Sequence, residues 1–203
     1  MKNKKVLAIF GGSFNPPLNS HFSLAEQILT EYENIEKVMF VPVSTKYNKK
    51  GLISNEHRYN MLKIVCDKNE KFELSDIEMI QKEQLNTLET LELMQKEYPE
   101  HTLYFTMGTD NLKELSTWGL AEELVKKFKF LIIERDNDEI EKIIENDEFL
   151  KTYKKSFLKV KENIRSNISS TFVREKIKKG KSIRYFTPDD VYFYIKENNL
   201  YNF

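Results

Sequence analysis

The sequence predicts an α/β fold built on a doubly wound parallel sheet. Short apolar runs alternate along the 203 residues with segments in which apolar residues recur every three or four positions. This alternation is typical of strand–helix–strand units, which form parallel sheets covered by helices on both faces. No linker of low complexity and no internal repeat interrupts it, so we expect a single domain over residues 1–203.

The first unit is an apolar strand at residues 6–10, a glycine turn and a helix. The turn contains Gly11 and Gly12, and the helix would bury Phe22, Ala25, Ile28 and Leu29 on one face. Adjacent glycines let a backbone approach a ligand, and the N–H groups at a helix start attract phosphate. His21 would lie about one turn inside this helix and point back toward its start. Taken alone, such a turn is more often an ordinary connection with a surface histidine.

A second apolar run at residues 37–43 predicts a buried strand. The polar loop after it contains three lysines, among them Lys49 and Lys50. Lysine-rich loops are usually solvated surface. Open α/β sheets place their ligands beyond the carboxyl ends of the strands, however, which favours a phosphate contact in this loop.

Two helices and a short strand follow. Apolar spacing predicts helices at residues 54–67 and 88–98, with a strand at residues 71–74 between them. Thr87 directly precedes the second helix, so its plainest role is to cap the helix N-terminus. Cys66 lies among apolar residues and is expected to be a buried thiol.

The next strand, at residues 101–107, ends at Gly108 and Asp110. A carboxylate just past a strand end is well placed to accept hydrogen bonds from ribose hydroxyls. Trp118, the only tryptophan, would by burial tendency be a core residue or a half-buried anchor. We expect another strand at residues 128–133, an acidic helix on the surface at residues 137–150, and a last strand at residues 158–160.

Residues 167–174 read Asn-Ile-Ser-Ser-Thr-Phe-Val-Arg. Three hydroxyl residues, Ser169, Ser170 and Thr171, open a helix, and Arg174 follows one turn inside it. A guanidinium beside the free N–H groups of a helix start is a strong site for phosphate oxygens. Gly180 is expected to end this helix, and a final helix would begin with Thr187 as its N-cap and Pro188 after it.

Composition excludes several classes of protein. The single cysteine excludes internal disulfides and cysteine-based zinc sites. No apolar run reaches ~18 residues and no leader-like segment precedes the first strand, so we expect a cytoplasmic protein with no membrane partner. The formal net charge is zero, but residues 151–184 contain twelve basic and only two acidic side chains. No basic and aromatic motif of a known nucleic-acid module accompanies them, so no nucleic-acid partner is expected.

Two of these stretches resemble sequence signatures of a known superfamily. The stretch from Gly12 to Pro16, Gly-Ser-Phe-Asn-Pro, with His21 after it, resembles the first signature of the nucleotidyltransferase superfamily. The string at residues 167–174 resembles the ISSTxxR signature of the same proteins. The chain looks most like the nicotinamide or nicotinate mononucleotide adenylyltransferases, and among them the eukaryotic-type branch, over nearly its whole length. This resemblance implies a Rossmann-like nucleotidyltransferase fold with C-terminal helices.

The resemblance also implies a reaction and a set of site residues. The 5′-phosphate of the mononucleotide would attack the α-phosphorus of ATP and release pyrophosphate, giving NAD or its deamido form. His21, Lys49 and Arg174 would be the catalytic, charge-carrying residues. The further groups that would bind ATP phosphates are Gly12, Ser13, Phe14, Lys50, Ser169, Ser170 and Thr171. Those that would bind the mononucleotide or a ribose are Thr87, Gly108, Asp110 and Trp118. Mg²⁺ would bind mainly through ATP phosphates, so no protein metal ligand is named.

Three positions depart from the family pattern, and one of them is Ser20, which stands where a glycine or a larger residue is usual. Leu18 stands where a polar residue is usual, which would remove one phosphate contact and predicts that Leu18→His raises turnover. Gln84 stands where eukaryotic-type members have a second aromatic residue. Two alternatives therefore stay open: transfer to another phosphorylated acceptor, and a degenerate homologue that binds nucleotide with weak activity. The choice between nicotinamide and nicotinate is also open, as is the oligomeric state, for which a homo-oligomer is one option.

Overall fold

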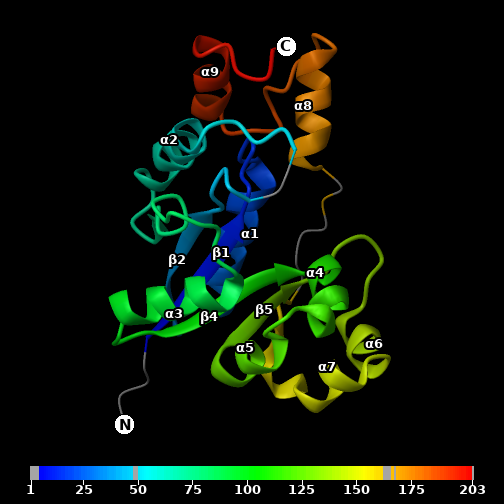
Figure 1. Cartoon of the computed structure of the whole chain (residues 1–203). Helices are drawn as coiled ribbons and strands as arrows, with labels where there is room; N and C mark the ends of the chain where they lie inside the picture. Colours follow the sequence, from blue (N-terminus) through cyan, green and yellow to red (C-terminus); the bar gives the residue numbers. More distant parts are fainter. Residues whose placement is uncertain (1–4, 48–49, 162–165, 167, 203) are drawn as a thin grey trace.

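A computed structural model describes residues 5–47, 50–161, 166 and 168–202. Within them six strands form one parallel sheet in the order β3-β2-β1-β4-β5-β6 (Figure 1). The strands are β1 (Val6–Gly12), β2 (Ile35–Pro42), β3 (Phe72–Leu74), β4 (Thr102–Gly108), β5 (Lys129–Ile133) and β6 (Phe157–Lys159). Each matches a predicted strand to within two residues at either end.

Helices cover both faces of this sheet, as a doubly wound sheet requires. One set comprises α1 (Asn19–Glu31) and α2 (Asn55–Cys66), and the other comprises α3 (Thr87–Glu97) and α5 (Ala121–Lys127). Alternate residues of β1 point to opposite faces, so Leu7 and Ile9 pack against α3 and α5. Val6, Ala8 and Phe10 pack against α1 and α2. The predicted apolar face of α1 is buried at all four positions, which are Phe22, Ala25, Ile28 and Leu29.

The acidic segment differs from its prediction. Instead of one helix over residues 137–150, the structure has α6 (Ile140–Glu145) and α7 (Glu148–Thr152). The break falls at Asp147, whose side chain accepts a hydrogen bond of 2.9 Å from the N–H of Leu150 and so caps a new helix. The sequence analysis also missed two short elements after β4, which are α4 (Thr109–Glu114) and α5.

Two further helices lie beyond the carboxyl ends of β1 and β2 (Figure 1). They are α8 (Ser170–Lys178) and α9 (Asp189–Glu197), and together with Leu18 and Met61 they form a separate apolar cluster. Ser169 caps α8, and Gly180 ends it with φ +62°, as predicted. The predicted cap of α9 is wrong: the N-cap is Pro188, and the buried Thr187 hydroxyl has no hydrogen-bond partner among the described residues.

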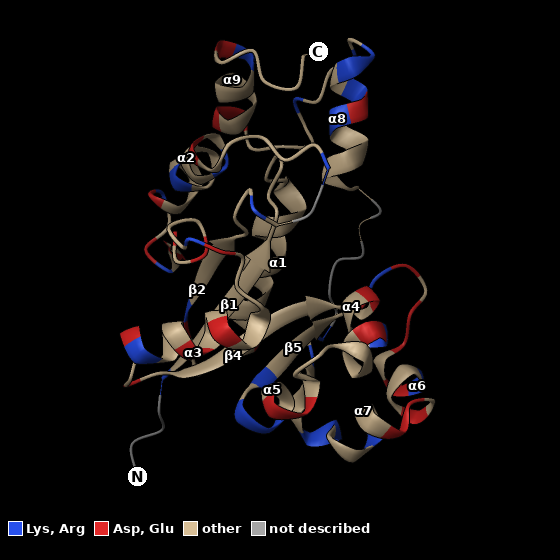
Figure 2. Cartoon of the chain, in the orientation of Figure 1, with Lys and Arg blue, Asp and Glu red and all other residues tan. Residues whose placement is uncertain are grey.

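The charged segments separate in the fold. Acidic side chains gather around α6 and α7, whereas basic side chains dominate α8 at the other end of the molecule (Figure 2). Within the described residues, no helix is both long and apolar enough to span a membrane.

Candidate functional site

A cleft of about 960 Å³ opens at the carboxyl ends of the strands. It lies between β1 and β4, where the strand order reverses direction, which is the usual ligand site of open α/β sheets. Its volume is in the range of small-molecule sites. The predicted site residues that line it include those of the glycine loop after β1, the segment around Thr87 and the start of α8.

His21 lines the cleft one turn inside α1, as predicted. Its Nδ1 accepts a hydrogen bond of 2.9 Å from the N–H of Leu18, so the ring proton of the neutral form lies on Nε2. Burial, with a contribution from the charge of Arg135, lowers the pKa of His21 to about 4. The sequence analysis treated His21 as a charged group. A ring with this pKa is a neutral hydrogen-bond donor at pH 7.

The glycine loop holds His21 in place through Phe14. The Phe14 ring is buried and meets the His21 ring edge to face at 5.1 Å. Phe14 has φ +45°, a conformation that is costly for a large side chain. A Cβ on Gly12 would lie 3.1 Å from the Phe14 ring, so the glycine lets this ring close over the strand end. Ser13 also lines the cleft, and its carbonyl accepts a hydrogen bond from Arg58.

The start of α8 is tied directly to this loop. Arg174 donates from Nη1 to the carbonyl of Asn15 at 2.8 Å and from Nη2 to the Thr171 hydroxyl at 3.0 Å. Ser170 donates from its hydroxyl to the carbonyl of Pro16 at 2.8 Å. These contacts join the two predicted phosphate motifs across about 159 residues of chain. Ser169 caps α8 by accepting from the N–H of Phe172, and it also lines the cleft.

The lysine loop reaches the same cleft. Lys50 lines it, next to the glycine loop. Lys49, the residue that the resemblance favours, lies outside the described residues. Lys50 of this loop and Arg174 of α8 therefore both line the cleft.

The segment before α3 forms another wall. Thr87 lines the cleft but does not cap the helix, because Asn86 does so through a reciprocal pair of hydrogen bonds with Glu89. Trp118 is half-buried, packs on the core and also lines the cleft. Gln84 lines it as well, and its Nε2 donates to Leu85 and Glu78.

Glu78 is a buried acid that the sequence analysis did not single out. Its carboxylate accepts hydrogen bonds from the Thr90 hydroxyl at 2.9 Å and from Gln84 at 3.3 Å. Burial raises the pKa of Glu78. The Oε1 of Gln84, beside it, is buried and has no hydrogen-bond partner within the part of the chain that the structure describes.

Gly108 and Asp110 occupy the end of β4 and the first turn of α4, and both line the cleft. A Cβ on Gly108 would lie 2.3 Å from Asp110 Oδ1 and 2.6 Å from Arg135 Nε. A side chain at this position would therefore displace the ends of Asp110 and Arg135, both of which are exposed.

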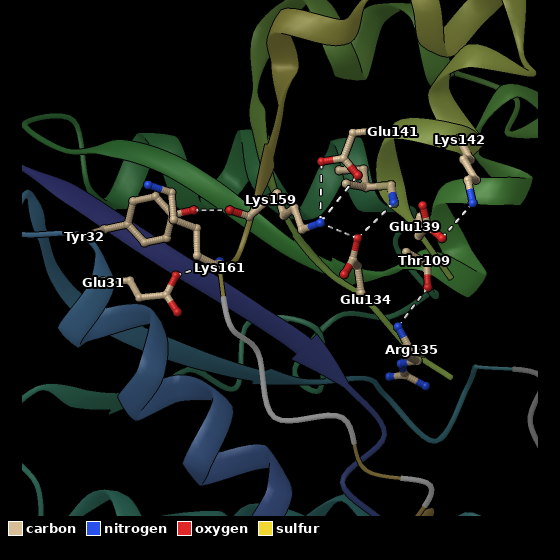
Figure 3. A network of polar contacts seen from close by, with 11 residues as sticks. Glu31, Tyr32, Thr109, Glu134, Arg135, Glu139, Glu141, Lys142, Lys159 and Lys161 are labelled. Carbon is tan, nitrogen blue, oxygen red and sulfur yellow. Dashed lines mark hydrogen bonds and ion pairs between the residues drawn. The ribbon is translucent and has the colours of Figure 1, made fainter. Parts of the chain in front are cut away.

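Arg135 is a cleft residue that the sequence analysis missed. It follows β5, and its Nη1 lies 3.4 Å from Asp110 Oδ2. Its N–H donates to the Thr109 hydroxyl, while its neighbour Glu134 turns the other way, toward Lys159 at 2.7 Å (Figure 3). The position just past the end of a strand was the available signal, and the sequence analysis applied it after β2 and β4 but not after β5.

Comparison with known proteins now identifies the family. The sequence model of the cytidylyltransferase-like family matches residues 9–176, which include all the cleft segments described above. The chain belongs to the cytidylyltransferase-like family.

Curated relatives of this cytidylyltransferase-like chain match nearly its full length. One from Carboxydothermus hydrogenoformans is 34% identical over 196 residues, covering 96% of this chain and 97% of its own. One from Clostridium botulinum is 35% identical over 198 residues, covering 96% and 98%. Both are named probable nicotinate-nucleotide adenylyltransferase. Both are bacterial, and the assignment to the eukaryotic-type branch stays a prediction.

A solved structure has the same fold. It is Plasmodium falciparum nicotinic acid mononucleotide adenylyltransferase complexed with NaAD, with a TM-score of 0.78 and 26% sequence identity over 97% of each chain. The Rossmann-like nucleotidyltransferase fold predicted from the sequence is confirmed.

The structure also changes the interpretation of Leu18 in this cytidylyltransferase-like protein. The Leu18 side chain is 1% exposed and packs in the cluster formed by α8 and α9, not against the cleft. Its backbone N–H makes the polar contact instead, to His21. The departure from the family pattern therefore serves the packing of the C-terminal helices.

Proposed function

We propose that this chain joins ATP to nicotinate or nicotinamide mononucleotide, giving the dinucleotide and pyrophosphate in NAD biosynthesis. Support comes from the relatives named nicotinate-nucleotide adenylyltransferase and from the cleft itself. The observation that carries the proposal is the hydrogen bond from Arg174 to the Asn15 carbonyl. This bond holds the start of α8 against the glycine loop. The two segments expected to bind phosphate therefore line the same cavity.

The reaction needs positioning and charge stabilisation rather than a protein nucleophile. An oxygen of the mononucleotide 5′-phosphate attacks the α-phosphorus of ATP, the bond to the bridging oxygen breaks, and pyrophosphate leaves with that oxygen. Arg174 and Lys50 offset the charge that moves onto the pyrophosphate. His21 donates a hydrogen bond from Nε2 to a phosphate oxygen. The N–H groups of the glycine loop hold the reacting phosphates in line. Lys49 is proposed for the triphosphate as well.

Mg²⁺ is proposed to enter with ATP. Among the described residues there is no group of three or more His, Cys, Asp and Glu side chains that could hold a metal ion. The phosphate oxygens of ATP and water would therefore be its ligands, as is usual for Mg²⁺. When bound, the ion screens the charge of the triphosphate. Arg174 and the lysine loop orient the triphosphate.

The opposite end of the cleft fits a pyridine nucleotide. Trp118 offers an aromatic face to the ring. Thr87 and its backbone lie at the start of α3, where N–H groups attract an acidic or amide ring substituent. Asp110 accepts hydrogen bonds from ribose hydroxyls, with Gly108 leaving it room. The names of the relatives favour nicotinate as the first choice of base.

The experiment that tests this function measures pyrophosphate release from ATP and Mg²⁺ with purified protein. Nicotinate mononucleotide, nicotinamide mononucleotide and no acceptor are compared in parallel. Release that depends on either mononucleotide supports the proposal and gives the base preference. A folded protein that binds ATP but releases pyrophosphate with neither would contradict it and favour the degenerate homologue or another phosphorylated acceptor.

A further inference from the structure

Asn15 makes hydrogen bonds to several elements at the phosphate end of the cleft. Its side chain is 2% exposed. Its Nδ2 donates to the Gly51 carbonyl at 2.7 Å, and its Oδ1 accepts from the N–H of Ile53 at 3.4 Å. Its backbone carbonyl accepts from Arg174. Through its side-chain amide Asn15 ties the glycine loop to the end of the lysine loop, and through its backbone carbonyl it ties the glycine loop to α8. All three elements are proposed to hold ATP.

The remaining contact of Asn15 comes from far along the chain. The hydroxyl of Tyr201 donates to Asn15 Oδ1 at 3.0 Å, across about 186 residues. Tyr201 follows α9, is 3% exposed and packs among Leu18 and the apolar residues of α8 and α9. Burial raises the pKa of its hydroxyl, which keeps the proton that this hydrogen bond needs.

The backbone around Tyr201 is shaped for this contact. Asn199 and Tyr201 have φ values of +49° and +63°. The left-handed conformation is uncommon for a tyrosine and is kept only where the surrounding structure enforces it. The resulting turn directs the ring back under the glycine loop.

Without the Tyr201 hydroxyl, the Asn15 amide would be weakly held. Among the described residues, its Oδ1 would keep only the 3.4 Å contact with Ile53, which is at the long limit of a hydrogen bond. The amide plane would then be free to turn, and its bond to the Gly51 carbonyl would loosen. The lysine loop would lose its fixed distance from Arg174.

We propose that Tyr201 is a positioning residue for the triphosphate end of the cleft and acts by fixing the Asn15 side chain. This inference rests on the proposed use of ATP. Tyr201 touches no substrate. It holds together the elements that do.

The test compares Tyr201→Phe with Tyr194→Phe. Both changes remove one hydroxyl from the C-terminal segment, but Tyr194 bonds His57 and Asn60 of α2, away from the cleft. Affinity for ATP with Mg²⁺ alone is measured by calorimetry, at a temperature where circular dichroism shows both variants folded. We expect Tyr201→Phe to weaken ATP binding about fivefold, the effect of one lost hydrogen bond, and Tyr194→Phe to leave it nearly unchanged.

Two further readouts separate positioning from general stability. In turnover assays Tyr201→Phe should raise the KM for ATP while the KM for the mononucleotide stays near its original value. Asn15→Ala should weaken ATP binding by itself, and Tyr201→Phe added to it should have no further effect. Equal ATP affinities in the wild type and Tyr201→Phe, or additive losses in the double variant, would overturn the inference alone. A wild type that does not bind ATP would overturn the proposed function together with it.

Discussion

The backbone N–H of Leu18 donates a hydrogen bond of 2.9 Å to Nδ1 of His21. This contact fixes the ring so that a proton on Nε2 is available to the cleft. It also means that protonating the free ring would break a hydrogen bond, which agrees with the lowered pKa of about 4.

Binding of ATP should therefore raise the pKa of His21. Phosphate charge beside the ring stabilises its protonated form, and a nearby opposite charge shifts a pKa by roughly one to three pH units. The chain has only three histidines, so their NMR titrations can be assigned by substitution. His101, which pairs with Glu36 near the amino ends of the strands, serves as the internal control. An unchanged His21 titration in the ATP complex would exclude contact with phosphate.

Arg174→Ala should lower kcat/KM for ATP by about 10- to 100-fold, because it removes a charged donor from the phosphate end. It also breaks the bond to the Asn15 carbonyl. The KM for the mononucleotide should change little. Arg184→Ala is the matched control, since Arg184 lies over Phe193 outside the cleft. Unchanged ATP kinetics in Arg174→Ala would refute the phosphate assignment.

Leu18→His should destabilise the protein rather than raise turnover. The side chain is buried among apolar residues, and an imidazole there loses its hydrogen bonds to water. We expect a loss of about 1–3 kcal/mol in the free energy of unfolding, measured by urea denaturation. A stable Leu18→His variant with a higher kcat would restore the expectation drawn from the sequence.

Gly108→Ala should impair the site while leaving the fold intact. The new Cβ would displace Asp110 and Arg135, both of which end in flexible side chains. We expect kcat/KM to fall while the melting temperature changes little. Gly119→Ala should have a much smaller effect, because nothing lies within 4 Å of its Cβ position. Equal kinetics for the two variants would show that the two displaced side chains are dispensable.

Glu78→Gln should remove a pH dependence of stability. Burial raises the folded-state pKa of Glu78 above its unfolded value. Between those two values the folded protein binds more protons, so the free energy of unfolding falls as the pH rises through this window. Glutamine does not titrate, so the variant should show a flatter profile of melting temperature against pH. Glu145→Gln, at an exposed position, should keep the original slope.

The sequence predicted the sheet because its signals are local. The four apolar positions of α1 and the run that forms β1 define their elements without help from the rest of the chain. The acidic segment was misread because Asp147 caps a second helix inside a continuous apolar pattern. Short helices such as α4 and α5 are stabilised by packing, which a window of sequence does not contain.

The site was predictable only in part, for the same reason. Ser169, Arg174 and the glycine loop lie in sequence motifs that by themselves suggest phosphate binding. Arg135 acquires its role because it follows β5 and meets Asp110 of α4. Glu78 acquires its role because α3 brings Thr90 beside it. The side chain of Leu18 could be placed only once α8 and α9 were seen to pack against it.

The contact between Asn15 and Tyr201 bears on how the protein is made. Ribosomes synthesise Asn15 early and Tyr201 about 186 residues later. The sheet strands are all complete by residue 159, so a nascent chain can form its core while the nucleotide site is still open. With the role proposed for Tyr201, the triphosphate end of the cleft is completed only after the strands of the sheet have been made.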